Sequence, residues 1–349
     1  MTLSSTCEAV PVQKRCETRI LQQPARIMAV ADVSQFGVTD AQIVHAAELI
    51  RAGRLVAFPT ETVYGLGANA LDAAAVERIF KAKCRPHSSP IICHVSDLTM
   101  VHQLVAEWPV AAQQLADKFW PGPLTLVLRK TSAVTDLATA GLPTVGVRMP
   151  AHLIALALLR AAGVPIAAPS ANRFTQVSPT TAEHVRQSLG DRVDFILDGG
   201  PCPVGIESTV LTLVGPTPVL LRPGGISRQQ IEAVIGPVAS ALDQDLGEAH
   251  ASPGLHPRHY SPRTRLYLVE KGKVPLQGRG AYLQLALPPR GSVSEVILMP
   301  GDAAAYAGKL YSTLHLLDAR GYDWIAVDAP PQVPEWEAVL DRLKRAASC

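Results

Sequence analysis

Polar and charged side chains cluster where the predicted strands and helices of this sequence end. Lys83 and Arg85 follow a helical segment, Ser170 and Asn172 follow a buried strand, and Arg222 ends another strand. Ligands of open α/β sheets bind in crevices at strand ends. Two cations two residues apart in an extended segment can both face one anion. Charge alone also permits a plainer interpretation, in which Lys83 and Arg85 are a solvated pair that closes the helix.

Several common catalytic motifs are missing from the sequence. It contains no GxxxxGK[ST] phosphate loop, no GxGxxG after a strand, no HExxH and no GxSxG. Ser170 is therefore not expected to be a nucleophile. None of the six cysteines forms a CxxC pair, so a zinc ribbon finds no support. Scattered cysteines without a signal peptide indicate reduced thiols and a cytoplasmic location. We expect Cys84 and Cys93 to be structural.

The composition indicates a globular chain of about two domains. The chain has 349 residues, of which 48% are hydrophobic and 5% aromatic. Such a chain can bury a sizeable core, built mainly of Val, Leu, Ile and Ala. A length well above ~150 residues favours more than one domain. The net charge of +2 is low for a protein that holds nucleic acid by its overall field, so any basic site is local.

No segment predicts a membrane helix or a secretory signal. No uninterrupted apolar run reaches ~18 residues, and the N-terminus lacks an apolar core. We interpret residues 1–38 as an N-terminal extension. Its arginines would suit a transit peptide, but Glu8 and Glu17 argue against one.

Helix-like and strand-like patterns alternate after residue 38 and predict a mixed α/β chain. Helices are predicted at 40–53, 72–83, 111–120, 151–162, 178–189, 229–235, 303–318 and 335–346. Strands are predicted at 55–59, 90–95, 124–129, 144–149, 164–168, 193–197, 208–214, 218–222, 265–269, 280–287, 293–298 and 324–328.

Three further expectations follow from local sequence. Residues 60–68 are predicted to form a loop, and the strands at 208–214 and 218–222 an antiparallel hairpin. Ser178, followed by a proline, is predicted to cap the N-terminus of a helix. The composition changes after residue 236, which predicts a catalytic domain at 39–236, a linker at 237–263 and a small α/β domain at 264–349.

Seven motifs of the first predicted domain occur in a specific order. They are FPTETVYGLGANA, the Lys83-x-Arg85-Pro86 segment, PGPLTLVL, VGVRMPAH, APSANRF, DGGPCPVGIESTV and LLRPGG. Together they resemble the YrdC-like L-threonylcarbamoyladenylate synthases over residues 40–236. The segment SPGLHPRHYSP resembles the linker of the long, two-domain members. The resemblance implies a twisted, open mixed sheet with helices, followed by a small Rossmann-like α/β domain.

The resemblance also implies a reaction. Members of this family make threonylcarbamoyl-AMP from L-threonine, bicarbonate or CO2, and ATP with Mg2+, and they release pyrophosphate. A separate tRNA threonylcarbamoyl transferase complex then modifies tRNAs that read ANN codons. Stable tRNA binding is not required for the first step, and no membrane is involved.

Individual residues of the family's site map onto this sequence. The family's KxR and SxN tetrad falls on Lys83, Arg85, Ser170 and Asn172. The residues implied to hold L-threonine are Thr62, His94, Arg129, the backbone of Ala168, and Ser208. The residues implied to bind ATP are Arg85, Ser89, Thr125, Ser170, Ser178, Arg222 and the linker residue Tyr260. The linker would then act as a lid over the nucleotide. No direct protein ligand of the metal is implied.

Two positions depart from the family pattern, and some assignments stay open. Cys84 stands where the family has Gly, so either the local backbone differs or the position does not need a positive φ. Ser89 stands where the family has Asn. Glu61 and Glu207 could bind metal or orient loops, and Arg148 could simply pair with an acid.

Two other functions stay open. The first is an RNA-binding or ribosome-assembly module with a basic concave face. The second is a carbamoyl-transfer domain of hydrogenase maturation, against which the absence of zinc-finger-like cysteines counts.

Overall fold

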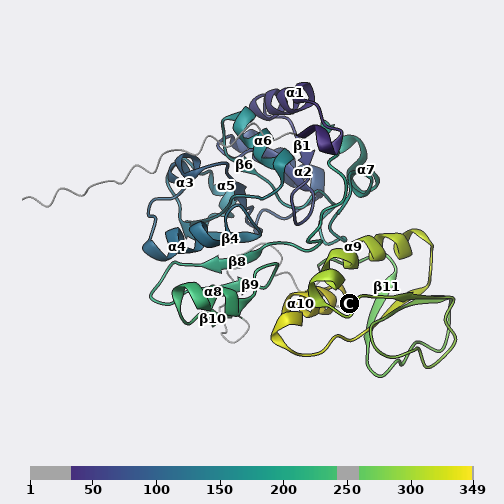
Figure 1. Ribbon diagram of the computed structural model, residues 1–349. Coiled ribbons are helices and arrows are strands. Elements are labelled where there is room, and N and C mark those ends of the chain that lie inside the picture. Colours follow the sequence, from purple (N-terminus) through teal and green to yellow (C-terminus); the bar gives the residue numbers. More distant parts are fainter. Residues whose placement is uncertain (1–32, 242–258, 348–349) are drawn as a thin grey trace, which may run out of the picture. The chain divides into compact units, whose positions relative to one another are not determined.

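The strands of the described residues form two separate sheets. The computed structural model describes residues 33–241 and 259–347 (Figure 1). The larger sheet mixes parallel and antiparallel pairs in the order β10-β9-β8-β4-β5-β3-β6-β2-β1-β7. Its strands are β1 Val56–Phe58, β2 Gly65–Asn69, β3 Cys93–His94, β4 Leu124–Arg129, β5 Thr144–Arg148, β6 Ile166–Ala167, β7 Phe195–Ile196, β8 Thr209–Thr212, β9 Val219–Arg222 and β10 Ala239–Ser240. The predicted α/β class with an open mixed sheet is confirmed.

Eight α-helices accompany the larger sheet within the described residues. They are α1 Asp40–Arg51, α2 Ala73–Lys83, α3 Leu98–Leu104, α4 Val110–Phe119, α5 Asp136–Thr139, α6 Leu153–Ala162, α7 Ala182–Leu189 and α8 Arg228–Ile235. Helix α1 shows why the sequence folds this way locally. Thr39 accepts a hydrogen bond from the backbone of Gln42, whose side chain returns one to Thr39, and this reciprocal cap starts the helix.

The smaller sheet lies in the C-terminal part of the chain and is parallel throughout. Its order is β11-β14-β12-β13. Its strands and helices are β11 Arg265–Val269, β12 Gly280–Gln284, β13 Glu295–Leu298, β14 Trp324–Asp328, α9 Ala303–Ala319 and α10 Glu337–Ala347. This is the Rossmann-like pattern expected from the sequence. Both sheets belong to one compact unit.

Parts of the predicted extension and linker lie outside the described residues. These are residues 1–32 and 242–258, together with the last two residues of the chain. The predictions that residues 1–38 form an extension and that the linker acts as a lid therefore remain predictions for these segments. At the ends of the predicted linker, residues 237–241 and 259–263 are described.

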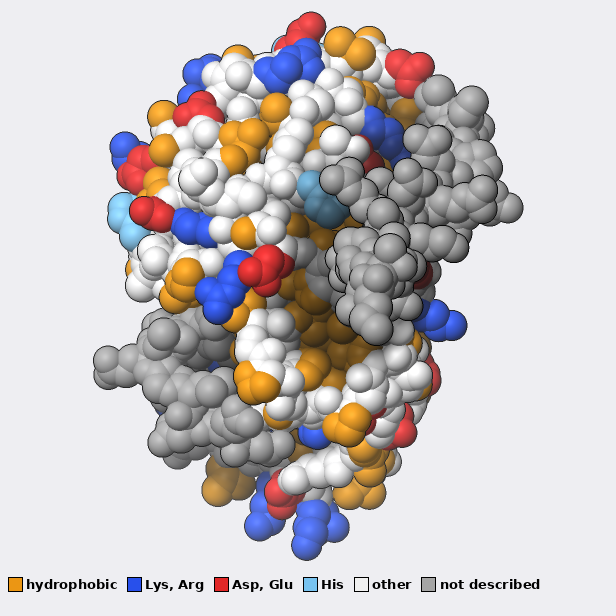
Figure 2. All heavy atoms as spheres, turned by 90° about the vertical axis from the view of Figure 1, so that its left-hand side faces the viewer, with side chains coloured by type: hydrophobic (Ala, Val, Ile, Leu, Met, Phe, Trp, Pro, Cys, Tyr) orange, Lys and Arg blue, Asp and Glu red, His pale blue; other side chains and the backbone are white. Residues whose placement is uncertain are grey.

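The described surface is mixed in character. On the face shown in Figure 2, Lys and Arg side chains are scattered among acidic ones, and hydrophobic side chains gather in a hollow. None of the described helices combines the length and the apolar character needed to cross a bilayer.

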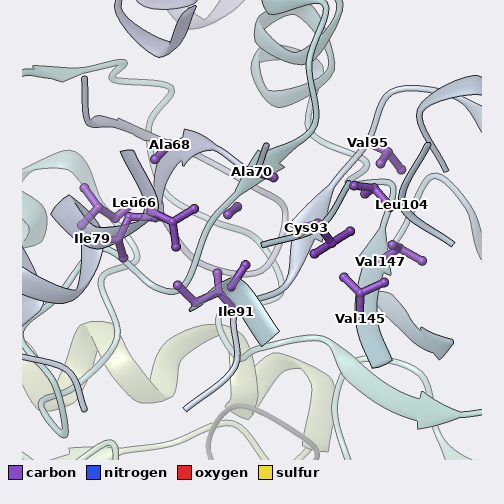
Figure 3. Close-up of a cluster of buried hydrophobic side chains, with 14 of the residues drawn as sticks. Leu66, Ala68, Ala70, Ile79, Ile91, Cys93, Val95, Leu104, Val145 and Val147 are labelled. Atoms are coloured by element: carbon purple, nitrogen blue, oxygen red, sulfur yellow. The ribbon is translucent and has the colours of Figure 1, made fainter. Parts of the chain in front are cut away.

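Alternation along the strands sorts side chains between two faces of the larger sheet. Leu124, Leu126 and Leu128 point to the main core, together with Val145 and Val147. Figure 3 shows part of this core, where side chains of β2, α2, β3, α3 and β5 meet. The intervening positions of the strands face the other way.

This opposite face of the sheet is only partly covered by helices. Towards the edge strand β7, α1 and α6 pack against it in a second apolar cluster that includes Phe58 of β1 and Ile166 of β6. Further along the sheet, the same face carries His94, Thr125 and Arg148. Strand alternation thus places polar side chains together on a part of the sheet that α1 and α6 leave uncovered.

Most predicted helices and strands are present, within a few residues at their ends. Strands β4, β11 and β14 have the predicted bounds, and β8 and β9 form the predicted antiparallel hairpin. The prediction of a loop at 60–68 was wrong for its second half, because Gly65–Asn69 is strand β2. Helices α3 and α5 were not predicted.

Ser178 does not cap a helix. Helix α7 begins at Ala182, and its cap is Thr181, whose side chain accepts a hydrogen bond from the backbone of His184. The correct cap was hidden by a run of several candidate cap residues in SPTTAE. Ser178 instead donates a hydrogen bond to Glu207, at a distance of 2.5 Å.

Cys84 adopts the left-handed backbone conformation that glycine favours. It is the C-cap of α2, with φ 54° and ψ 42°. Both alternatives considered for the Gly-to-Cys departure were therefore wrong, since the position needs a positive φ and Cys84 supplies it. A side chain in this region costs roughly 1–2 kcal/mol. The turn also means that Lys83 and Arg85 do not lie in an extended segment.

We predict that Cys84→Gly stabilises the protein by about 0.5–1 kcal/mol, because relief of the left-handed strain exceeds the extra entropy of glycine in the unfolded chain. Thermal unfolding should show a midpoint raised by about 2 °C. Cys84→Ala is the matched control, since it removes the thiol and keeps the Cβ. Equal shifts for the two variants would contradict the strain argument.

Two histidines stack between α7 and α9. The rings of His184 and His315 are 3.8 Å apart and inclined by 17°. His315 also contacts the backbone carbonyl of Ser178 through Nε2, at 3.0 Å. Burial, and then the neighbouring His315, lowers the pKa of His184 to about 4. The pair is therefore neutral in the folded protein at pH 7.

We predict that stability falls as the pH drops from about 6.5 towards 4. Unfolded histidine binds a proton near pH 6.5, whereas folded His184 resists protonation until about pH 4. The unfolded chain therefore binds more protons throughout this window. The midpoint of thermal unfolding, measured at intervals from pH 7.5 to 4.5, should fall less in His184→Gln than in wild type. His45→Gln, at an exposed residue of α1, is the comparison variant.

Candidate functional site

A cavity of about 60 Å³ lies at the partly uncovered face of the larger sheet. Its wall combines cations, hydroxyl groups and apolar side chains from segments far apart in the sequence. The lining residues are Thr60, Thr62, Val63, Gly65, Arg85, Ile92, His94, Arg148, Ala168, Pro169, Ser170, Glu207, Ser208, Arg222, His259 and Tyr260. Eight of the residues implied by the sequence resemblance are among them.

The four residues of the predicted tetrad come together. The Lys83 ammonium donates to the backbone carbonyls of Ser170, at 2.6 Å, and of Asn172. Arg85 donates to the carbonyls of Ser89, at 3.3 Å, and Pro90, at 2.8 Å. Lys83 thereby ties the end of α2 to the segment after β6. Arg85 and Ser170 line the cavity, whereas Lys83 and Asn172 lie directly behind its wall.

Both cations of the tetrad are buried without a carboxylate partner. Lys83 is 1% exposed and Arg85 is 8% exposed. Within the described ranges, neither forms a salt bridge to an acid. Burial, and then the neighbouring Arg85, holds the pKa of Lys83 well below its usual value, and burial lowers the pKa of Arg85 to about 10. Buried positive charge of this kind is costly unless an anion accompanies it.

The two polar atoms of the Asn172 side chain differ in their hydrogen bonding. Its amide nitrogen donates to the carbonyls of Arg173 and Gln176, at 2.9 and 2.8 Å. Among the described residues, its buried oxygen Oδ1 has no hydrogen-bond partner. An amide oxygen is an acceptor, so it suits a cation better than a phosphate oxygen.

Four of the five residues implied for L-threonine line the cavity. These are Thr62, His94, Ala168 and Ser208. Burial, and then Arg148, lowers the pKa of His94 to about 3, so its ring is neutral. Its Nδ1 has no hydrogen-bond partner within the described ranges. Arg129 lies elsewhere: it is exposed at the end of β4 and is not among the lining residues.

Arg148 is the arginine that lines the cavity beside His94. Register pairs His94 of β3 with Arg148 of β5. The guanidinium donates to Glu61 at 2.6 Å and to the hydroxyl of Thr62 at 3.0 Å. The expected pairing with an acid is thus present, and the residue faces the cavity as well. The alternation in TVGVR, where Val145 and Val147 are the core positions, is the sequence signal that could have found it.

The residues implied for ATP lie in and beside the cavity. Arg85, Ser170, Arg222 and Tyr260 line it. Thr125 hydrogen-bonds Ser208 at 2.8 Å and lines an adjoining hollow that also contains Ile92 and Gly146. Ser178 is fully buried against Glu207. Ser89 is half-buried, and its carbonyl, which any residue would provide, is the group that meets Arg85.

The described end of the linker closes the cavity. Tyr260 is 1% exposed, and its hydroxyl has no hydrogen-bond partner in the part of the chain that the structure describes. Its φ of 60° is unusual for a residue with a side chain. His259 packs edge-on against the Tyr260 ring, at 4.0 Å. Burial, and then the cations Arg85 and Lys83, lowers the pKa of His259 well below its usual value. Sequence reasoning missed His259, although it stands next to Tyr260.

Each of the two acids of the site is held by an arginine. Glu61 is held by Arg148 and by the backbone N–H of Ala151, at 3.0 Å. Burial raises the pKa of Glu207, but Arg342 and Arg222 outweigh it and lower the pKa, so this carboxylate is ionised. The described residues contain no group of three or more His, Cys, Asp or Glu arranged to hold a metal. Burial raises the pKa of Cys93 to about 12, which fits a structural thiol.

Two family profiles together match nearly the whole described chain. The Sua5/YciO/YrdC profile, described as "Telomere recombination", matches residues 48–224. A profile described as the C-terminal domain of threonylcarbamoyl-AMP synthase matches residues 226–348.

Individual relatives agree with the profiles. Threonylcarbamoyl-AMP synthase of Bacillus subtilis is 42% identical over 330 residues, which cover 90% of this chain and 95% of that protein. The synthase of Pyrococcus abyssi is 42% identical over 316 residues, covering 86% and 93%. A crystal structure of P. abyssi Sua5 complexed with L-threonine matches with a TM-score of 0.82 at 40% identity, covering 89% of this chain and 95% of that one.

We predict that Arg148→Met lowers the free energy of unfolding by about 3–5 kcal/mol, because it leaves buried Glu61 without its partner. Arg129→Met should change it by less than about 0.5 kcal/mol, since Arg129 is exposed. Urea unfolding of both variants makes the comparison. Adding Glu61→Gln to Arg148→Met should restore part of the loss, and a failure to do so would mean that the cost does not come from the unpaired acid.

Proposed function

The chain belongs to the Sua5/YrdC family in its long form, and we propose that it is an L-threonylcarbamoyladenylate synthase, a nucleotidyltransferase that makes threonylcarbamoyl-AMP from L-threonine, bicarbonate or CO2, and ATP. The observation that carries this proposal is the pair of buried cations, Lys83 and Arg85, without an acidic partner beside the cavity. The triphosphate of ATP is an anion that would compensate them. The L-threonine in the P. abyssi complex supports the choice of amino acid.

The proposed chemistry needs no covalent enzyme intermediate. The amine of threonine attacks CO2 and loses a proton, which gives a carbamate. A carbamate oxygen then attacks the α-phosphorus of ATP, the bond to the bridging oxygen breaks, and pyrophosphate leaves. Negative charge grows on the phosphate oxygens in the transition state, so preorganised cations in a dry site stabilise it. Lys83 and Arg85 would do this work, and the Ser170 hydroxyl would donate to a phosphate oxygen.

The other half of the cavity offers suitable partners for threonine. Neutral His94 and the hydroxyls of Thr62 and Ser208 are hydrogen-bonding groups that carry no net charge. We propose Arg148 as the cation nearest the carboxylate of threonine, in place of Arg129, because Arg148 lines the cavity. Guanidinium groups pair well with carboxylates.

Mg2+ would enter with ATP. The carboxylates near the cavity are engaged by arginines, so the phosphates themselves would be the main ligands. The Oδ1 of Asn172, which has no partner among the described residues, would suit a cation chemically, although Asn172 lies behind the cavity wall. Bound Mg2+ would supply positive charge to the triphosphate.

The size of the cavity supports a lid role for the linker. About 60 Å³ is far less than the several hundred that a ligand of this size occupies. Because His259 and Tyr260 form part of the wall, ATP would enter when this segment moves away. Closure afterwards would exclude water from the product, a mixed anhydride that hydrolyses readily. A downstream tRNA threonylcarbamoyl transferase would then consume it in the cytoplasm.

An RNA-binding module finds less support. The net charge is +2, and basic side chains on the visible face in Figure 2 are scattered among acidic ones. Salt-sensitive tRNA binding without turnover would favour that function over the enzyme.

We predict pyrophosphate release that requires L-threonine, bicarbonate and Mg-ATP together. Lys83→Met should lower turnover at least about 100-fold, the scale of removing one preorganised charge. Its unfolding midpoint should shift by no more than about 4 °C, since losing an unpaired buried charge offsets two lost hydrogen bonds.

The matched control is Lys81→Met on the same helix, at a side chain that is 74% exposed; it should retain wild-type turnover. Pyrophosphate release that ignores threonine would refute the proposed function. Near-normal turnover in Lys83→Met would remove Lys83 from its role.

A further inference from the structure

The carboxylate of Glu207 is held from two parts of the chain. Ser178, beside the larger sheet, donates to Oε1 at 2.5 Å. The C-terminal helices supply two donors to Oε2: Tyr311 of α9 at 3.0 Å and Arg342 of α10 at 2.8 Å. Glu207 lines the cavity, whereas Tyr311 and Arg342 do not. The C-terminal part of the chain thus reaches the wall of the site through one carboxylate.

Arg342 is the largest fully buried side chain of the described protein. Its guanidinium lies over the Tyr260 ring, 5.1 Å from the ring centroid, and donates to Asp341 at 2.7 Å. Tyr311 stacks against Tyr260, and the centroids of the two rings are 5.9 Å apart. One arginine therefore contacts both the acid in the cavity wall and the linker tyrosine that closes the cavity.

The carboxylate of Glu207 is also influenced by a second cation. Arg222 lines the cavity and is, after Arg342, the strongest cationic influence on Glu207. Without Arg342, buried Glu207 would lose the stronger of these two cationic influences. Tyr260 would lose the cation that lies over its ring. This loss would weaken the support of its backbone, because a positive φ at Tyr260 depends on the surrounding contacts.

We infer that Arg342 is a positioning residue for the nucleotide, which holds Tyr260 closed over the cavity from the C-terminal part of the chain. The inference rests on the proposed function and assigns a role in the reaction to the C-terminal α/β part. Arg342 would act on ATP affinity more than on the chemical step, because it touches the lid and not the reacting atoms.

The test compares Arg342→Met and Arg342→Lys in full-length protein. Arg342→Met should raise the KM for ATP at least tenfold, with the KM for threonine and kcat each changing less than threefold. Arg342→Lys keeps a charge beside Glu207 and should recover part of the ATP affinity. Arg320→Met is the control, since it breaks the Arg320–Glu295 pair within the same C-terminal part; its KM for ATP should stay at the wild-type value.

A double-mutant cycle separates positioning from plain loss of structure. In a Tyr260→Ala background, adding Arg342→Met should raise the KM for ATP no more than threefold, because the lid it supports is already gone. Should Arg342→Met fail to fold, Tyr311→Phe keeps the ring stacking, removes one bond to Glu207 and should raise the KM for ATP about threefold.

The outcomes distinguish this inference from the proposed function. Wild-type protein without threonine-dependent turnover overturns the proposed function. Active wild type with an unchanged KM for ATP in Arg342→Met, or fully multiplicative effects in the cycle, overturns the positioning role alone.

Discussion

The site depends on positive charge that is buried and only partly neutralised. Two acids border the cavity, and each is already engaged by an arginine: Glu61 by Arg148 and Glu207 by Arg342. Lys83 and Arg85 are left with backbone carbonyls as partners. Carbonyl dipoles satisfy hydrogen bonds but do not cancel a net charge. The cavity therefore favours an anion, although the chain as a whole carries only +2.

The alternation of the strands is what gathers these groups. On β4 and β5 one set of alternate residues is apolar and builds the main core, and the other set faces the cavity side. Register then decides which of the second set meet, as it does for His94 and Arg148. Helices α1 and α6 cover one end of this face and leave the rest for a ligand. The same alternation along the strands therefore builds the main core on one face of the sheet and gathers the site residues on the other.

Much of the fold could be predicted because its signals are local. Apolar spacing identified α1 with all four of its buried positions, Ile43, Ala46, Ala47 and Ile50. Strand β2 was missed because it contains Gly65 and Gly67, which are poor strand formers. A Cβ at Gly67 would lie 2.8 Å from the side chains of Phe58 and Ile166, so the glycine is required by packing that the sequence does not display.

The candidate site was predictable as a set of motifs, and its geometry was not. The tetrad does assemble. Alternation marks Arg148 as facing away from the core, but that Arg148 is buried at the cavity while Arg129 is exposed depends on the assembled sheet. Two residues at the site, Cys84 and Tyr260, hold a positive φ with no glycine to favour it. Such conformations persist only where surrounding contacts over-determine them. For Tyr260 the contacts come from α9 and α10, more than 40 residues further along the chain. The shape of the site therefore depends on the C-terminal part of the chain, because the local sequence preference alone would not hold Tyr260 in its positive-φ conformation.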